Sequence, residues 1–120
     1  MQSILTSIKK MLGIQEDYEY FDQEIIAAIN TALMELTQIG VGPSEGYRIE
    51  DEDSIWEDFV PDINRLEAVK SYVYLKVKLL FDPPNSSTLM EATNRQIERL
   101  EWRLCVAVDP PLTKEENQNG

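Results

Sequence analysis

The chain has 120 residues, with 22 acidic side chains against 11 basic ones, a net charge of −11 and one cysteine, Cys105. This length predicts a single domain, and the negative charge disfavours sequence-specific DNA binding, which relies on a basic surface. One cysteine excludes an intrachain disulfide, and we expect its side chain to be buried or half-buried as a small apolar group. We recognise no secretory signal and no span long enough for a bilayer, so we expect a protein made in a cytoplasm, with no membrane partner.

Two amphipathic helices are predicted in the first third of the chain. Residues 4–12 carry apolar side chains at helical spacing, with Ser3 placed as the N-cap and Gly13 as the C-terminal stop. A polar connector follows. A longer helix is then predicted from Gln23 to Ile39, with Asp22 as its N-cap.

The connection between the second and third helices, residues 40–62, is predicted to be irregular and acidic. A short helical turn around residues 54–59 would place Trp56 and Phe59 on the core. The most acidic part, called the acidic run below, consists of Glu50, Asp51, Glu52 and Asp53. It lacks the residue pattern of a calcium-binding loop. Two interpretations stay open: a solvated loop, or a surface that faces a basic neighbour or lines a negatively charged passage.

Two further helices are predicted in the second half. Residues 63–81 are apolar on most of the helical circumference, which is typical of a helix at the centre of a bundle. Asp82-Pro83-Pro84 ends that helix because proline cannot continue it. Thr88 to Glu91 has the form of a capping box and begins a last helix that runs to about Leu104. Residues 105–108 either extend this helix or form a short extended segment.

These elements predict an all-α fold. We expect a small bundle of four main helices, with an irregular acidic loop between the second and third helices and an extended C-terminal tail. Residues 1–108 are expected to form the helical domain, and residues 109–120 a flexible tail.

The sequence predicts no catalytic, cofactor-binding or metal-binding site. Without histidine and with one cysteine, the usual zinc sites and His-based triads cannot be assembled. Gly-rich phosphate-binding motifs are absent as well. We therefore expect a structural protein and no enzyme. The main alternative is an acidic regulator that mimics DNA and occupies the basic cleft of a nucleic-acid enzyme. A third alternative is a carboxylate-only metal hydrolase.

A candidate contact patch lies near the end of the last helix. Trp102 is flanked by Arg99 and Arg103 and falls outside the apolar stripe of that helix. Tryptophan and arginine are enriched at the centres of protein interfaces. Packing of Trp102 on another helix of its own subunit explains the pattern equally well, and Tyr74 on the third helix is open to the same two interpretations.

Several segments together resemble a known family. They are Phe21-Asp22-Gln23-Glu24-Ile25-Ile26 in the second helix, Leu79-Leu80-Phe81-Asp82-Pro83-Pro84 at the end of the third, and Leu100-Glu101-Trp102-Arg103-Leu104 in the last. Across residues 4–108 the chain resembles the head-tail connector proteins of long-tailed bacteriophages, also called adaptor or head completion proteins. The Phe-Asp-Pro-Pro break and the Leu-Glu-Trp-Arg-Leu ending carry most of the likeness.

The resemblance implies a structural virion protein at the head-tail junction. Such subunits form a ring, usually dodecameric, below the portal protein. The ring extends the DNA channel, lets DNA pass without specific binding, and presents a surface for the next connector, stopper or tail protein. Docking on the portal through the C-terminal segment would correspond to residues 103–114 here, and residues 40–62 would face the channel or a neighbouring subunit.

The expected site residues follow from these interpretations. No residue is assigned to catalysis, to a cofactor or to a metal. The candidates for the subunit or portal interface are Tyr74, Arg99, Trp102, Arg103, Leu104, Val106 and Val108. The candidates for a surface that faces the channel or a neighbour are Glu50, Asp51, Glu52 and Asp53.

Overall fold

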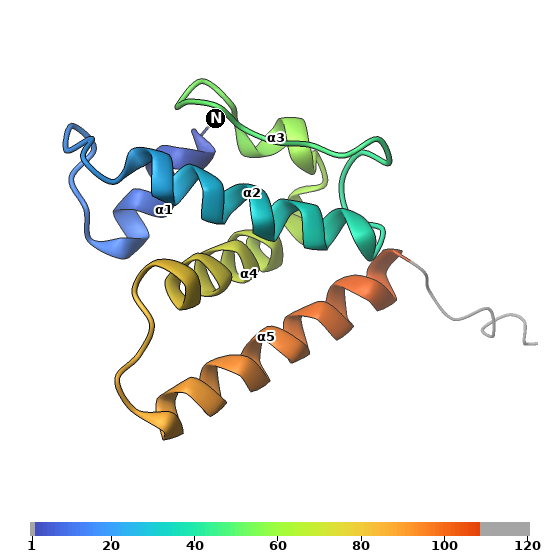
Figure 1. Cartoon of the computed structure of the whole chain (residues 1–120). Coiled ribbons are helices and arrows are strands. Elements are labelled where there is room, and N and C mark those ends of the chain that lie inside the picture. The colour runs from blue at the N-terminus through green and yellow to red at the C-terminus, as the bar shows by residue number, and fades with distance from the viewer. Residues whose placement is uncertain (1, 109–120) are drawn as a thin grey trace, which may run out of the picture.

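The computed structural model describes residues 2–108, with side-chain surroundings up to Val106. In chain order the helices are α1 (Ile4–Leu12), α2 (Asp22–Gln38), α3 (Trp56–Phe59), α4 (Ile63–Phe81) and α5 (Ser87–Val108). Figure 1 shows α2 lying across α4, with α5 on the opposite side of α4 and with α1 and α3 on the side of α2. Helix α3 is a single turn, so the other four are the main helices of the bundle. The predicted all-α bundle of four main helices is confirmed.

Helix α1 begins and ends where its sequence predicts. The Ser3 Oγ accepts a hydrogen bond from the Thr6 backbone nitrogen at 3.2 Å. Gly13 adopts φ +83°, a left-handed conformation that suits glycine, and its N–H donates to the Lys10 carbonyl. Both predicted end signals are confirmed.

Helix α2 begins differently from the prediction. Phe21 occupies the N-cap position without a side-chain hydrogen bond, and Asp22 is the first helical residue. The Asp22 carboxylate instead forms an ion pair with Lys9, with the Oδ1 atom 2.8 Å from Nζ. The prediction of an Asp22 cap was wrong, because the Asp22 carboxylate pairs with the buried ammonium group of Lys9. An unpaired buried charge costs more free energy than an uncapped helix end.

Helix α4 is the central helix, as predicted, and contacts α1, α2 and α5. Asp62 caps it by accepting a hydrogen bond from the Asn64 backbone nitrogen at 2.9 Å. Its buried side chains are Leu66, Val69, Tyr72, Val73 and Val77. A helix with neighbours on several sides has to be apolar around much of its circumference, which explains the weak amphipathic pattern of this segment.

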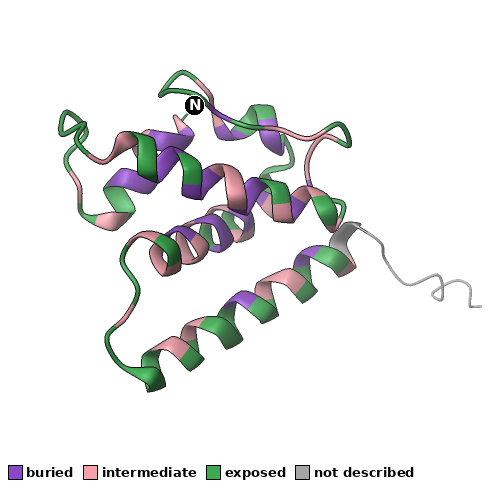
Figure 2. Ribbon diagram, viewed as in Figure 1, coloured by how far each residue is buried: buried purple, intermediate pink, exposed green. Residues whose placement is uncertain are grey.

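Helix α5 starts one residue before Thr88. Ser86 caps it, because its Oγ accepts hydrogen bonds from the backbone nitrogens of Thr88 at 3.1 Å and Leu89 at 3.3 Å. The predicted cap by Thr88 was therefore wrong, and Ser86 occupies the position that satisfies the free N–H groups. The helix runs through Val108, which selects the helical alternative for residues 105–108. Among its described side chains, Ile97 and Leu104 are buried, and Figure 2 shows green along much of the helix.

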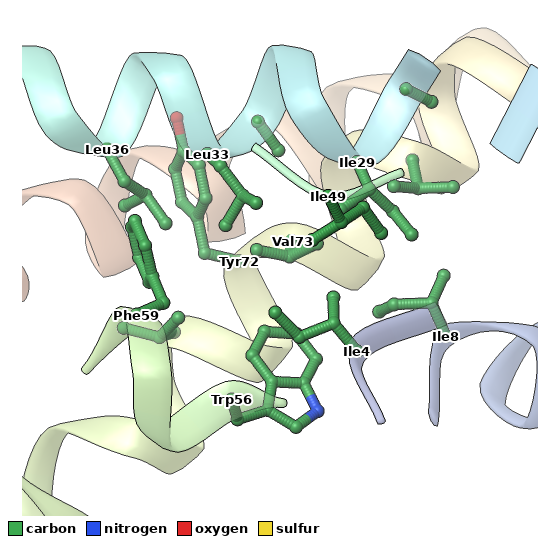
Figure 3. Packing of buried hydrophobic residues seen from close by; sticks show 14 of the residues in the cluster. Ile4, Ile8, Ile29, Leu33, Leu36, Ile49, Trp56, Phe59, Tyr72 and Val73 are labelled. Atoms are coloured by element: carbon green, nitrogen blue, oxygen red, sulfur yellow. The ribbon is translucent and has the colours of Figure 1, made fainter. Parts of the chain in front are cut away.

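The core lies between α2 and α4 and is closed from the side by α1 and α3. Figure 3 shows Trp56 and Phe59 of α3 directed inward, with Trp56 near Ile4 of α1. Both aromatic side chains are buried, as predicted. The indole nitrogen of Trp56 donates a hydrogen bond to Ser7 Oγ at 3.0 Å, so its polar atom is satisfied inside the protein.

Candidate functional site

Residues 40–62 are attached to the helices on both sides of the acidic run. Before it, Asn30 of α2 donates from Nδ2 to the Ile49 carbonyl at 3.0 Å and accepts from the Ile49 nitrogen at 2.7 Å. After it, the Ile4 nitrogen donates to the Ser54 carbonyl at 2.9 Å, within a bridge between Ser3 and Ile55. The acidic run is therefore a short loop with fixed ends.

All four carboxylates of the acidic run are exposed. Asp51 accepts a hydrogen bond from the Asp53 nitrogen at 2.9 Å, which closes a local turn. Within the part of the chain that the structure describes, no three His, Cys, Asp or Glu side chains are grouped so that they could hold a metal ion. Over the same residues, no helix combines the length and apolar composition needed to cross a membrane.

One residue of the acidic run belongs to a larger surface feature. Glu52 lines a groove together with residues of α1 and of the connector between α1 and α2. This acidic groove is lined by Leu5, Thr6, Lys9, Gln15, Glu16, Asp17, Glu19, Asp22 and Glu52. The sequence pattern predicts only a polar connector for residues 15–22 and does not predict the groove. The signal was the density of carboxylates in two acidic segments that the fold brings side by side.

Lys9 holds the connector in place and is itself neutralised. It is 2 % exposed, its Nζ forms the ion pair with Asp22, and the same atom donates to the Glu16 carbonyl at 2.9 Å. These bonds fix the connector beside α1. The charge of Lys9 is matched by Asp22, so the exposed carboxylates of Glu16, Asp17, Glu19 and Glu52 leave the groove negatively charged.

The predicted contact patch on α5 is exposed. Trp102 is 71 % exposed, which rules out the interpretation that it packs on another helix of its own subunit. It shares a shallow depression with neighbours spaced along the same helix, and this outer face of α5 comprises Arg95, Glu98, Arg99, Trp102 and Arg103. Among the described residues, none of these arginines has a carboxylate oxygen within 4.0 Å.

The remaining candidates for the interface are placed less favourably. Leu104 is buried in the core of its own subunit, where a partner would not reach it. Tyr74 and Val106 are half-buried, and Tyr74 packs against the core. The side chain of Val108 lies outside the described residues. Cys105 is exposed, so the expectation of a buried or half-buried thiol was wrong.

A polar network fixes the orientation of α5. The Tyr72 hydroxyl of α4 lies 2.9 Å from Glu101 Oε2 on α5 and 3.5 Å from Glu35 Oε1 on α2. Lys76 of α4 compensates the negative charge of Glu35, with its Nζ atom 2.8 Å from Glu35 Oε1. Burial, and then the hydrogen bond to Glu101, raise the pKa of Tyr72 far above its ordinary value. The inner face of α5 is thereby bound to the bundle, and its outer face is presented on a rigid support.

A helical bundle that presents an exposed Trp–Arg face and an acidic groove defines a protein that works through contacts with other macromolecules. The family comparison agrees, because the chain matches the family model described as phage connector protein over residues 4–111. The chain therefore belongs to the phage connector family, as its resemblance implied. It is a structural head-tail connector protein of a bacteriophage, a component of the virion that interacts with other virion proteins. No curated protein and no solved structure matches it.

Proposed function

We propose that this chain is one subunit of a ring that docks below the portal protein, extends the DNA channel and allows the tail to attach. The observation that carries the proposal is the outer face of α5, where Trp102 and three arginines without carboxylate partners in the described residues are exposed. Arginines and a tryptophan gathered in this way are typical of residues that become buried in an interface.

A ring requires two different surfaces on each subunit. Copies related by rotation about one axis contact each other head to tail, so each copy must offer one surface to the neighbour ahead and another to the neighbour behind. In Figure 1, α5 and the loop that follows Ile49 lie on opposite sides of α4. The subunit thus has separate surfaces for two neighbours, and we propose a closed ring, dodecameric in the virion.

The partners along the ring axis are the portal on one side and the next connector, stopper or tail protein on the other. The family resemblance supports portal docking through residues 103–114. Their described part, the end of α5, includes Arg103, exposed, and Val106, half-buried. Helix α5 ends at an edge of the bundle (Figure 1).

The charge of the chain suits a channel through which DNA slides. A net charge of −11 repels phosphates. A wall of such subunits would make few of the Lys or Arg contacts that hold DNA in place. The exposed acidic run is proposed to face this channel or a neighbouring subunit. A DNA mimic would need its carboxylates spread along a rigid face, whereas the acidic run is confined to one turn.

Native mass spectrometry of the purified protein, alone and mixed with the portal of the same phage, tests the proposal. We expect a cyclic oligomer, either free or formed on the portal, with portal and connector rings in one complex. A protein that stays monomeric in both samples and never binds the portal would contradict it.

A further inference from the structure

We infer that, in the assembled ring, the outer face of α5 of one subunit docks into the acidic groove of the next subunit. This inference rests on the proposed ring and names the two surfaces that meet. It assigns Arg95, Arg99 and Trp102 to one side of the interface. It assigns Glu16, Asp17, Glu19 and Glu52 to the other.

The two surfaces are complementary in charge. The outer face of α5 carries three guanidinium groups that have no carboxylate within 4.0 Å among the described residues, and one acidic residue, Glu98. The acidic groove carries four exposed carboxylates, and its one lysine is already paired with Asp22. Arginine and carboxylate groups form strong, directional pairs when they are brought together away from water. The carboxylates of the groove could therefore pair with the guanidinium groups on the outer face of α5.

The shape and chemistry of the two surfaces also agree. The acidic groove is concave, and its lining includes Leu5 and Thr6 as well as carboxylates. The outer face of α5 presents Trp102, a large side chain that is 71 % exposed, among its arginines. An aromatic side chain surrounded by arginines and seated in a depression is typical of the residues that dominate binding energy.

The placement of the surfaces favours a ring over a twofold dimer. The two surfaces lie on opposite sides of the bundle, on α5 and beside α1 (Figure 1), so one copy cannot use both on the same partner. Contacts of this kind propagate from copy to copy and close when the rotation between copies divides a full turn. Every copy brings both surfaces, which makes a second copy the occupant we choose over DNA or the portal.

A charge-swap experiment tests the inference on the full chain with the portal present. One variant, Arg95→Glu/Arg99→Glu, makes the outer face of α5 acidic. The other, Glu16→Lys/Glu52→Lys, makes the groove basic. We expect each variant alone to need at least about tenfold more protein than the wild type to form the ring on the portal. Circular dichroism should show that both variants fold, because all four side chains are exposed.

The mixture of the two variants is the decisive arm. An acidic α5 face then meets a basic groove, and a basic α5 face meets an acidic groove, so rings of alternating subunits can close. We expect an equimolar mixture to assemble as the wild type does, with equal numbers of both variants in each ring by native mass spectrometry. Arg48→Glu serves as the control for a changed charge, since Arg48 is exposed and lines neither surface.

The outcomes separate this inference from the proposed function. If the wild type never assembles with the portal, the proposed function fails. If the wild type assembles and both variants assemble equally well, the ring stands and this inference is overturned. It is also overturned if Arg95→Glu/Arg99→Glu forms rings that no longer bind the portal, because α5 would then face the portal. It is overturned as well if duplex DNA quenches the tryptophan fluorescence of the wild type but not that of Trp102→Phe, because α5 would then face DNA.

Discussion

Asn30 binds both backbone polar atoms of Ile49, with the amide nitrogen 3.0 Å from the carbonyl oxygen and the amide oxygen 2.7 Å from the nitrogen. A side chain on α2 thereby satisfies both backbone polar groups of this buried loop residue. Ile49 itself is fully buried beneath α2 (Figure 3). The pair determines where the acidic run begins.

Replacement of Asn30 by alanine should destabilise the protein and loosen the acidic run. The buried N–H and C=O groups of Ile49 would lose both partners, which we expect to lower the free energy of unfolding by about 1–3 kcal/mol. Urea denaturation measures the loss, and limited proteolysis should show faster cleavage within residues 50–53. Thr31→Ala is the control, because its hydroxyl bonds only within α2, to the Ala27 carbonyl. Equal stability of Asn30→Ala and Thr31→Ala would contradict this account.

Loss of the carboxylate at Asp22 should cost more than loss of a surface charge. Asp22→Asn leaves the buried ammonium of Lys9 without its counter-ion. We expect a loss of about 2–3 kcal/mol, below the 3–5 kcal/mol typical of a fully enclosed pair, because the Asp22 side chain is 18 % exposed. Lys10→Met, a change at an exposed neighbour, should alter stability by less than about 0.5 kcal/mol.

A combined replacement separates pairing from burial. In Lys9→Met/Asp22→Leu both charges are gone, so the double variant should be more stable than Asp22→Asn. Chemical denaturation of the set measures this order. If Asp22→Asn unfolds at the same urea concentration as the wild type, the ion pair does not hold the connector.

The sequence predicted the helices far better than the surfaces. Apolar spacing and end signals such as Ser3 and Gly13 depend on neighbours in the chain, and they located the helices to within a few residues. The predicted caps Asp22 and Thr88 were wrong because local spacing does not reveal the contacts that replace them. Asp22 pairs with the buried Lys9, and Ser86, two positions before Thr88, accepts the hydrogen bond at the start of α5. The acidic groove was missed for a related reason, since Glu16 and Glu52 become neighbours only through the fold.

For the contact patch, the sequence identified Trp102 and its neighbouring arginines but left open whether Trp102 is exposed or packed within its own subunit. Whether Trp102 is buried depends on the position of α5 around its axis, and the network at Tyr72 fixes that position through Glu101. Arg95 lies one turn before Arg99 and lines the same surface, yet it was not among the predicted interface residues. Helical spacing alone could have added it.

Tyr72 should make stability fall in alkaline solution. In the unfolded chain its hydroxyl loses its proton near pH 10, whereas in the folded protein the pKa lies higher. The stabilisation is therefore complete below about pH 10 and is lost as the pH rises above it, by up to about 1.4 kcal/mol per pH unit. Below pH 10, Tyr72→Phe should be less stable by about 1 kcal/mol through loss of the hydrogen bond to Glu101.

The comparison of these two proteins isolates the effect from other groups that titrate in the same range. The stability difference between wild type and Tyr72→Phe should shrink between pH 10 and pH 11 in urea denaturation. A difference that stays constant over that range would show that the Tyr72 proton is not linked to folding.

Trp102 and Trp56 should respond oppositely to truncation. Trp102→Ala should change the free energy of unfolding by less than about 0.5 kcal/mol, because the side chain is exposed. The same variant should weaken ring formation by roughly thirtyfold, as expected for an interface residue that contributes about 2 kcal/mol to binding. Trp56→Ala should cost about 3–5 kcal/mol of stability by leaving a cavity. Met34→Ala, at an exposed apolar residue on α2, is the control for assembly. Sedimentation velocity with portal present measures ring formation, and wild-type assembly by Trp102→Ala would remove Trp102 from the interface.

Identical copies of this subunit are proposed to close into a ring on the portal. Electron microscopy of the purified protein mixed with the portal of the same phage tests it most directly. We predict portal particles that carry an added ring of connector subunits around a channel continuous with that of the portal. Bare portals beside dispersed single subunits, with connector protein in excess over the portal, would contradict this proposal.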